Sequence, residues 1–238
     1  MAGHSLSNLS GQVKHPILDK LISTTSLKFW TMILRCMTMK FQLYKASPEP
    51  WVPRNYAKRA VKFLLENASA ALFLDPGLGK TSITLAALKL LIKKKIVSKV
   101  LVIAPLRVCH LVWPKEGAKW RDFNELRIIV LHGPDKDALL ATEADIYVIN
   151  PEGLDWLIKP EKTVTISKKT GKKKVSLTCS LKRWKSLGFD TLVIDELSKF
   201  KHRDSLRFRT LKLVHHFFTR RWGLTGSPAA NGLMDLFG

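Results

Sequence analysis

Apolar and polar positions along the chain alternate between two patterns. Short runs of apolar, often β-branched residues are typical of buried parallel strands, and the segments between them repeat apolar residues at helical spacing. We expect strands near residues 71–74, 99–104, 127–132, 145–149, 191–195 and 221–225. We expect helices near residues 55–66, 80–93, 107–120, 152–158 and 203–217, with Pro114 breaking the third. This alternation predicts an α/β fold in which a parallel sheet is covered by helices on both faces.

One insert, at about residues 160–182, departs from this alternation. Two short β-type runs, 163–166 and 175–178, flank a lysine-rich turn that contains Gly171, which predicts a β-hairpin. One interpretation is a finger that contacts nucleic-acid phosphates through Lys168, Lys169, Lys172, Lys173 and Lys174. Another is a solvated hairpin whose charge prevents edge-to-edge pairing. A localisation signal is the third, and the sequence leaves all three open.

A glycine-rich turn joins the first expected strand to the helix at 80–93. Its sequence is Asp75-Pro76-Gly77-Leu78-Gly79-Lys80-Thr81. The glycines let backbone N–H groups surround a phosphate, and the helix adds partial positive charge at its N-terminus. We expect Lys80 to bind the β- and γ-phosphates and Thr81 to ligate Mg²⁺. The residues expected to bind the nucleotide here are Pro76, Gly77, Leu78, Gly79, Lys80, Thr81 and Ser82. A plain glycine turn is the alternative, because Leu74 replaces the first glycine of the general P-loop pattern.

Two adjacent acids, Asp195 and Glu196, follow the apolar strand expected at 191–195. Ligands of open α/β sheets bind at the carboxyl ends of the strands, where these acids would lie. We expect Asp195 to hold Mg²⁺ and Glu196 to orient or deprotonate an attacking water. The alternative is a strand that ends in solvated acids. The catalytic set predicted from the residues is therefore Lys80, Asp195 and Glu196, which must converge on one metal-bound triphosphate.

Six short motifs resemble, in order, those of the first RecA-like domain of superfamily-two helicases and translocases, in particular phage and bacterial Swi/Snf-type ATPases. They lie at residues 51–56, 75–81, 101–107, 145–150, 195–198 and 224–228, so the resemblance spans about residues 50–238. After the third motif, Trp113 and Glu116 keep the family's Trp-x-x-Glu spacing, and we expect Trp113 to be a core residue. It implies a DEAD/DEAH-box-like ATP hydrolase that depends on DNA and uses ATP and Mg²⁺. It also implies that Thr225, Gly226 and Ser227 couple the nucleotide site to the rest of a motor.

The resemblance extends to individual residues, with two departures. It places residues 51–56 on the adenine side of the site, where we expect Trp51, Arg54 and Tyr56 to line the pocket. Arg107 lies just past an expected strand end, where we expect it to contact a nucleic-acid phosphate. Ala57 stands where the family has an adenine-contacting glutamine, which puts base selectivity in question. Ser198 stands where the acidic motif usually ends in histidine, although a serine hydroxyl can still form a hydrogen bond.

The composition indicates the kind of binding partner and the cellular compartment. A formal net charge of +21 predicts a polyanionic partner, because neutralising phosphates dominates nucleic-acid affinity. The resemblance favours double-stranded DNA. The three cysteines form no C-x-x-C motif, which argues against a zinc site and for reduced intracellular thiols. No apolar run reaches the length of about twenty residues needed to cross a bilayer, so no membrane partner is expected. The expected location is the cytoplasm of a bacterial or phage-infected cell, or the nucleus of a eukaryotic one.

Domain organisation follows from the span of the motifs. Residues 41–238 are expected to form one RecA-like ATP-binding domain, whereas residues 1–40 are a poorly ordered arm, a helical appendage or an over-extended start. In the family a second RecA-like domain supplies arginine fingers, which are worth on the order of 10³ to 10⁵ in rate. We therefore expect an ATP-binding half that hydrolyses ATP slowly alone. Three explanations would fit a chain with only the first RecA-like domain. It is a gene fragment, a split protein completed by a separate chain, or a stand-alone binding module.

Two alternatives belong to other functional classes. One is a basic nucleic-acid-binding module whose ATP site is regulatory or vestigial. The other is an unrelated P-loop kinase or transferase, for which the sequence offers neither an acceptor pocket nor a lid.

Overall fold

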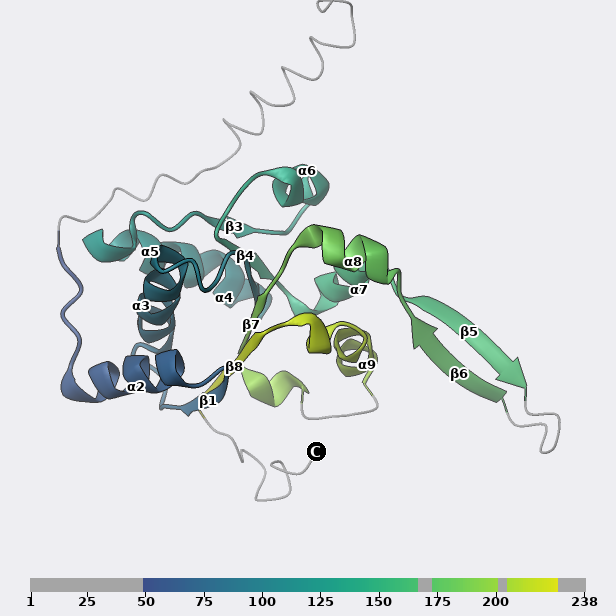
Figure 1. The fold of residues 1–238 in the computed structure, drawn as a ribbon, viewed down its shortest axis with the longest axis horizontal. Helices are drawn as coiled ribbons and strands as arrows, with labels where there is room; N and C mark the ends of the chain where they lie inside the picture. The colour runs from purple at the N-terminus through teal and green to yellow at the C-terminus, as the bar shows by residue number, and fades with distance from the viewer. Residues whose placement is uncertain (1–48, 167–172, 201–204, 227–238) are drawn as a thin grey trace, which may run out of the picture. The chain divides into compact units, whose positions relative to one another are not determined.

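Six parallel strands form the central sheet of the domain (Figure 1), in the order β1-β8-β7-β2-β4-β3. They are β1 (Ser69–Phe73), β2 (Val100–Ile103), β3 (Ile128–Val130), β4 (Ile146–Ile149), β7 (Thr191–Asp195) and β8 (Arg220–Thr225). Each expected strand is confirmed within two residues of its predicted bounds. The computed structural model describes residues 49–166, 173–200 and 205–226, which all belong to one unit, residues 43–238. The predictions for residues 1–40, Lys168, Lys169, Lys172 and Ser227 lie outside the described residues.

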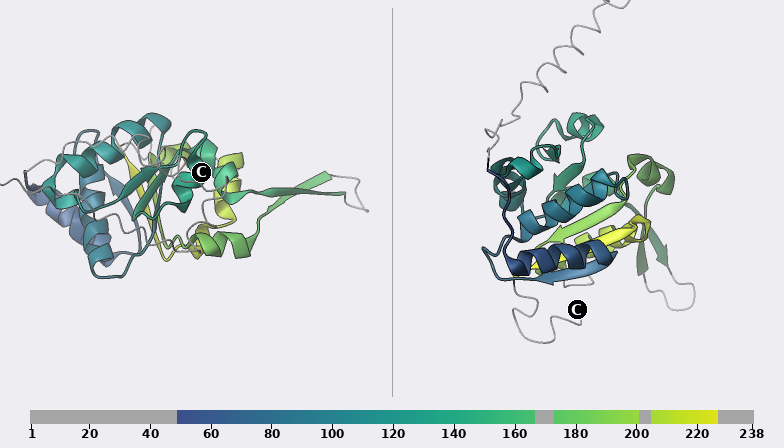
Figure 2. Two further views of the ribbon diagram at one scale, coloured as in Figure 1. Left: turned by 90° about the horizontal axis from the view of Figure 1, so that it is seen from above. Right: turned by 60° about the vertical axis from the view of Figure 1, so that its left-hand side comes forward.

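Successive residues of each central strand enter two different hydrophobic cores, one on each face of the sheet. Val100 and Val102 belong to the first core and Leu101 and Ile103 to the second, and all four are fully buried. The first core is completed by α2 (Asn55–Glu66), α3 (Lys80–Lys93) and α5 (Trp113–Lys119), and the second by α7 (Leu154–Ile158), α8 (Leu181–Leu187) and α9 (Leu206–Lys212). Figure 2 shows α2 and α3 crossing one face of the sheet. The prediction of an α/β fold with helices on both faces is confirmed.

The two longest helices have the predicted bounds, whereas the shorter ones differ in detail. The expected helix at 107–120 is broken as predicted, but at Val112, between α4 (Leu106–Leu111) and α5. Pro114 lies in the first turn of α5, where a missing N–H removes no helical hydrogen bond. The helices expected at 152–158 and 203–217 are shorter than predicted, since each region contains a short helix and a single 3-10 turn.

Two short helices, α6 (Lys136–Ala141) and α8, were not predicted. The bounds of α8 nevertheless follow from local signals. The Ser180 hydroxyl accepts a hydrogen bond from the backbone N–H of Arg183, and Gly188 ends the helix with a φ of 72°. These are a side-chain N-cap and a left-handed C-terminal residue. No helix within the described part of the chain is long and apolar enough to span a membrane.

The basic insert forms the predicted hairpin as a separate two-stranded sheet. Antiparallel strands β5 (Glu161–Ile166) and β6 (Lys173–Thr178) pair along their whole length, and each begins two residues before its predicted start. Figures 1 and 2 show the hairpin extending away from the six-stranded sheet. Lys173 and Lys174 lie on β6, opposite Ile166 and Thr165.

Candidate nucleotide-binding site

The glycine-rich turn runs from the end of β1 to the start of α3. Gly77 and Gly79 have φ angles of +85° and +74°, in the left-handed region that favours glycine. A Cβ added to Gly77 would meet nothing within 4 Å, so the backbone conformation, and not a lack of space, requires glycine there. Gly79 is the N-cap of α3, which has 14 residues. The turn therefore presents the positive end of a long helix at the carboxyl edge of the sheet.

Lys80, Thr81 and Ser82 form the first turn of α3. The Lys80 Nζ donates to the carbonyl oxygens of Leu74 at 2.6 Å and Asp75 at 3.2 Å, so the ammonium group lies against the loop. Thr81 and Ser82 are buried. The first turn of α3 carries no acidic side chain, so its own residues leave the positive helix end without a counter-charge.

Asp195 ends β7, which lies beside β8 in the sheet. Its Oδ2 accepts a hydrogen bond from Trp113 Nε1 at 3.0 Å. Burial raises the pKa of the Asp195 carboxyl, and the negative charge of Glu196 adds to that rise. The Trp113 bond and the positive charge of Lys80 act in the opposite direction, lowering that pKa. Lys80 is thus close enough to Asp195 to interact electrostatically, and a bound cation would favour the ionised carboxylate.

Glu196 has a φ of +66°, an uncommon value for a residue with a side chain. Its Oε1 accepts hydrogen bonds from Ser198 Oγ at 2.6 Å and from Thr225 Oγ1 at 3.1 Å. Backbone strain of this kind persists where surrounding contacts fix the conformation, and it concentrates at functional sites. The Thr225 bond joins the second and third motifs directly. Ser198, in the usual position of histidine, joins this network through its hydroxyl group.

The end of β8 also contacts the glycine-rich turn. The backbone N–H of Leu74 donates to the Thr225 carbonyl at 3.2 Å. A Cβ added to Gly226 would lie 3.0 Å from Pro76 Cδ, so glycine allows this close approach. The third motif is therefore bonded or packed against both other motifs, although their positions in the sequence are far apart.

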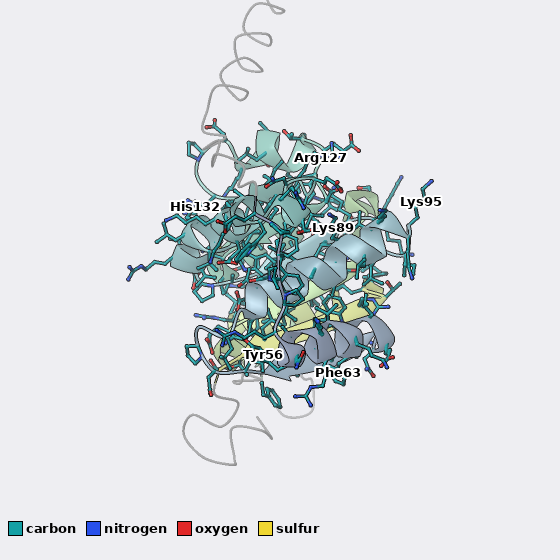
Figure 3. All side chains as sticks on the ribbon, turned by 90° about the vertical axis from the view of Figure 1, so that its left-hand side faces the viewer. Tyr56, Phe63, Lys89, Lys95, Arg127 and His132 are labelled. Carbon is teal, nitrogen blue, oxygen red and sulfur yellow. The ribbon has the colours of Figure 1, made fainter. Side chains whose placement is uncertain are left out.

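The start of α2 approaches the same loop. The Tyr56 hydroxyl donates to the Leu78 carbonyl at 3.2 Å, and Figure 3 shows Tyr56 at the first turn of α2. Arg54 is the exposed N-cap of α2. Ala57 is 5% exposed and packs in the first core, so no polar side chain occupies that position.

Two residues of the site were predicted only as packing or spacing features. Trp113, expected as a core residue, is fully buried and also donates to Asp195. Glu116 accepts a hydrogen bond from Ser82 Oγ at 2.9 Å. The available signal was the Trp-x-x-Glu spacing, because residues three positions apart lie on the same side of a helix.

The residues expected to contact nucleic acid lie on separate elements. Arg107 is exposed on α4, directly after the carboxyl end of β2. Lys173 and Lys174 are on the hairpin, which belongs to a different sheet. The structure thus places Arg107 at the sheet edge that carries the glycine-rich turn and the hairpin outside that sheet.

No cluster of three or more His, Cys, Asp or Glu side chains that could hold a metal occurs among the described residues. Magnesium in nucleotide sites commonly uses only one or two protein ligands, so Thr81 and Asp195 remain a suitable pair. The thiol of Cys109 is buried, and burial raises its pKa to about 12, which makes it a poor metal ligand.

A model of the SNF2-related domain family matches residues 56–238. The chain belongs to this family. The predicted resemblance to Swi/Snf-type ATPases and the RecA-like fold are confirmed, and the chain is an SNF2-related ATPase/helicase domain.

Curated relatives of this SNF2-related domain include a phage protein and a vertebrate protein. Protein p41 of Acyrthosiphon pisum secondary endosymbiont phage 1 is 30% identical over 197 residues, which cover 79% of this chain and 38% of that protein. Chromodomain-helicase-DNA-binding protein 8 of Danio rerio is 25% identical over 190 residues, which cover 77% of this chain and 7% of that protein. The chain therefore spans well under two thirds of either relative.

Solved structures show the same fold. The Sulfolobus solfataricus SWI2/SNF2 ATPase core in complex with dsDNA has a TM-score of 0.58 and 24% identity, and the match covers 83% of this chain and 36% of that one. The UvsW helicase from bacteriophage T4 has a TM-score of 0.56 and 17% identity, with 90% of this chain and 64% of that one covered.

Proposed function

We propose that this SNF2-related domain is the Mg·ATP-binding half of a DNA-dependent ATPase that translocates on DNA. The observation that carries the proposal is the meeting of three motifs at the carboxyl ends of three adjacent strands, β1, β8 and β7. The close packing of Gly226 on Pro76 and the Thr225–Glu196 hydrogen bond both span two motifs. A structural turn with solvated acids would need neither contact.

The residues fit a magnesium nucleotide. Gly77 and Gly79 adopt the backbone conformation that turns N–H groups toward an anion, and the first turn of α3 has no acid. Thr81 and Asp195 would hold the metal. Bound Mg²⁺ neutralises charge on the β- and γ-phosphate oxygens.

The chain's own groups would then act in sequence. Lys80 exchanges its bonds to the Leu74 and Asp75 carbonyls for phosphate oxygens. Glu196 orients the attacking water and accepts its proton, and the hydroxyls of Ser198 and Thr225 hold its carboxylate in place. Because Thr225 and Gly226 contact both other motifs, a change at the phosphates would be transmitted to the end of β8.

Nucleic-acid binding is supported by charge and by family. A net charge of +21 suits a phosphate backbone, and the archaeal relative with this fold was solved with double-stranded DNA. Arg107 and the hairpin lysines are the proposed contacts. The phage relative suggests action in the cytoplasm of a bacterial or phage-infected cell.

The activity of residues 1–238, tested alone, should be weak. The resemblance implies that a second RecA-like domain supplies arginine fingers, which are worth on the order of 10³ to 10⁵ in rate. That domain would belong to the same protein or to a partner chain. We therefore expect Mg·ATP binding with slow hydrolysis, with or without double-stranded DNA.

The first test is a calorimetric titration of residues 1–238 with a non-hydrolysable ATP analogue and Mg²⁺. The second measures single-turnover hydrolysis of ATP itself. Saturable binding supports the proposal, and no heat of binding refutes it. Fast, DNA-stimulated turnover by this chain alone would contradict the proposed need for a second domain. Binding that never affects any DNA-linked activity would favour a vestigial or regulatory site.

A further inference from the structure

Helix α5 carries two side chains that reach both halves of the proposed metal site. Trp113 and Glu116 lie three residues apart, so both project from one side of the helix. The Trp113 indole donates to Asp195 Oδ2 at 3.0 Å. The Glu116 Oε2 accepts from Ser82 Oγ at 2.9 Å. One helical turn is thus bonded to the end of β7 and to the start of α3.

These two contacts converge on the expected magnesium ligands. Trp113 bonds one of them, Asp195, directly, and Glu116 bonds Ser82, the neighbour of the other, Thr81. Trp113 is fully buried and Ser82 is 6% exposed, so the donor of each bond is shielded from water. Neither contact is required for the packing of the indole ring or of α3, because those are apolar contacts of the first core.

Glu116 is itself held in place by its own helix and its neighbour. The Trp120 indole donates to the same Oε2 at 3.3 Å, and Lys119 Nζ lies 3.7 Å from Oε1. A carboxylate with three partners has little rotational freedom, so it can fix the Ser82 hydroxyl and not merely follow it. The next turn of the chain contacts the segment before α2, where Asp122 Oδ2 accepts a hydrogen bond from the backbone N–H of Trp51 at 2.7 Å.

We propose that Trp113 and Glu116 are positioning residues that set the spacing between the magnesium ligands Asp195 and Thr81. This inference rests on the proposed function. Trp113 fixes the orientation of the Asp195 carboxylate, and Glu116 fixes the first turn of α3. Trp113 bonds only the expected metal ligand Asp195, so it acts on metal-dependent affinity and not on phosphate binding by Lys80 and the loop. Glu116 acts on the turn that carries both Lys80 and the other expected ligand, Thr81.

The test compares nucleotide affinity with and without metal. The 238-residue protein is titrated with a fluorescent non-hydrolysable ATP analogue, once in Mg²⁺ and once in EDTA, and the ratio of the two dissociation constants is the readout. Trp113→Phe keeps a buried ring but removes the donor. We expect it to reduce the metal-dependent ratio about tenfold, the size of one hydrogen bond to a charged group, and to leave the EDTA value unchanged.

Trp222→Phe is the matched control. Trp222 is 1% exposed, and its indole donates at 3.1 Å to the carbonyl of Asn67, just before the amino end of β1. This variant loses a buried indole hydrogen bond with no metal ligand involved. We expect a loss of thermal stability like that of Trp113→Phe, but an unchanged metal-dependent ratio.

Glu116 provides a second, independent measurement if Trp113→Phe does not fold. Glu116→Ala should reduce the ratio, and Glu116→Gln should restore most of it, because the glutamine oxygen can still accept from Ser82. A wild-type ratio of one would refute the proposed function together with this inference. A large wild-type ratio that Trp113→Phe and Glu116→Ala leave within about twofold would refute the inference alone.

Discussion

The glycine-rich turn is predicted to bind phosphates, and one interpretation of the β5–β6 hairpin is that it does so too, yet the two are held in opposite ways. The turn is contacted by segments far away in the chain: Tyr56 bonds the Leu78 carbonyl, and the end of β8 bonds Leu74 and packs on Pro76. The hairpin is a separate sheet stabilised by its own ladder, and a side chain such as Val164 remains 56% exposed.

The difference separates two ways of recognising an anion. The turn depends on geometry that several motifs impose together, so one substitution should remove a large share of its affinity. The hairpin offers charge on an exposed ladder, so its lysines should contribute in small, roughly additive and salt-dependent steps.

The largest effect is expected from Lys80→Ala. The ammonium group lies at the loop carbonyls and is the only charged group predicted to bind the phosphates directly. Its loss should weaken Mg·ATP binding by about a hundredfold or more, because hydrogen bonds between charged groups in a structured site are the strong ones. Calorimetry measures this change, and fluorescence anisotropy should show double-stranded DNA affinity largely retained.

Lys62→Ala is the matched control for Lys80→Ala. Lys62 is exposed on α2 and pairs only loosely, at 3.7 Å, with Glu66. The substitution removes the same charge from the surface, so it should leave nucleotide affinity unchanged. Equal effects of the two variants would mean that net charge, and not the geometry of the turn, determines binding.

The next effect concerns the hairpin. Replacing Lys168, Lys169, Lys172, Lys173 and Lys174 by glutamine should lower double-stranded DNA affinity by more than about tenfold at low salt. It should also flatten the dependence of log affinity on log salt by about 0.9 for each phosphate that the variant no longer neutralises. Nucleotide affinity should not change, since the hairpin lies outside the sheet that carries the turn. Anisotropy at several salt concentrations measures both quantities.

The control for the hairpin removes an equal charge elsewhere. Five exposed lysines on and after the helices α2 and α3 can be replaced together: Lys58, Lys62, Lys93, Lys94 and Lys95. If both sets flatten the salt dependence equally, the hairpin is a solvated element and the finger interpretation is wrong.

The sequence predicted local features well because they depend on neighbouring residues. Buried apolar runs predicted all six sheet strands, and the glycine spacing predicted the turn before α3. The Trp113–Asp195 bond joins residues 82 positions apart, so it follows from the strand order, which the pattern alone does not determine. The φ of Glu196 could not be expected either, because a glutamate gives no sequence signal for the left-handed region.

A smaller effect is expected from Thr225→Val, which tests the contact between motifs. Thr225 is 1% exposed and its hydroxyl holds Glu196 Oε1. Valine keeps the shape but removes the donor, so single-turnover hydrolysis should slow by about tenfold, with nucleotide affinity changed by less than about twofold.

Thr210→Val is the matched control for this contact. Thr210 is also fully buried, and its hydroxyl donates to Asp155 Oδ1 at 2.9 Å in the second core. Thr210→Val should lower the free energy of unfolding about as much as Thr225→Val does, but it should not slow hydrolysis. A lower rate in both variants would assign the effect of Thr225→Val to destabilisation and not to the position of Glu196.

The smallest difference should be that between ATP and GTP. Ala57 packs in the core, so the amide that would read the base edge is missing at this position. The Tyr56 ring, predicted to line the pocket, would stack on either base equally. Without a hydrogen bond to the base, discrimination should stay below about tenfold. Competition of each nucleotide against a fluorescent analogue measures this discrimination. Tyr56→Phe keeps the ring but removes the hydrogen bond to the Leu78 carbonyl of the loop, so it should weaken both nucleotides equally. A preference for ATP of about a hundredfold or more would show that another group of this chain forms a hydrogen bond with the adenine edge.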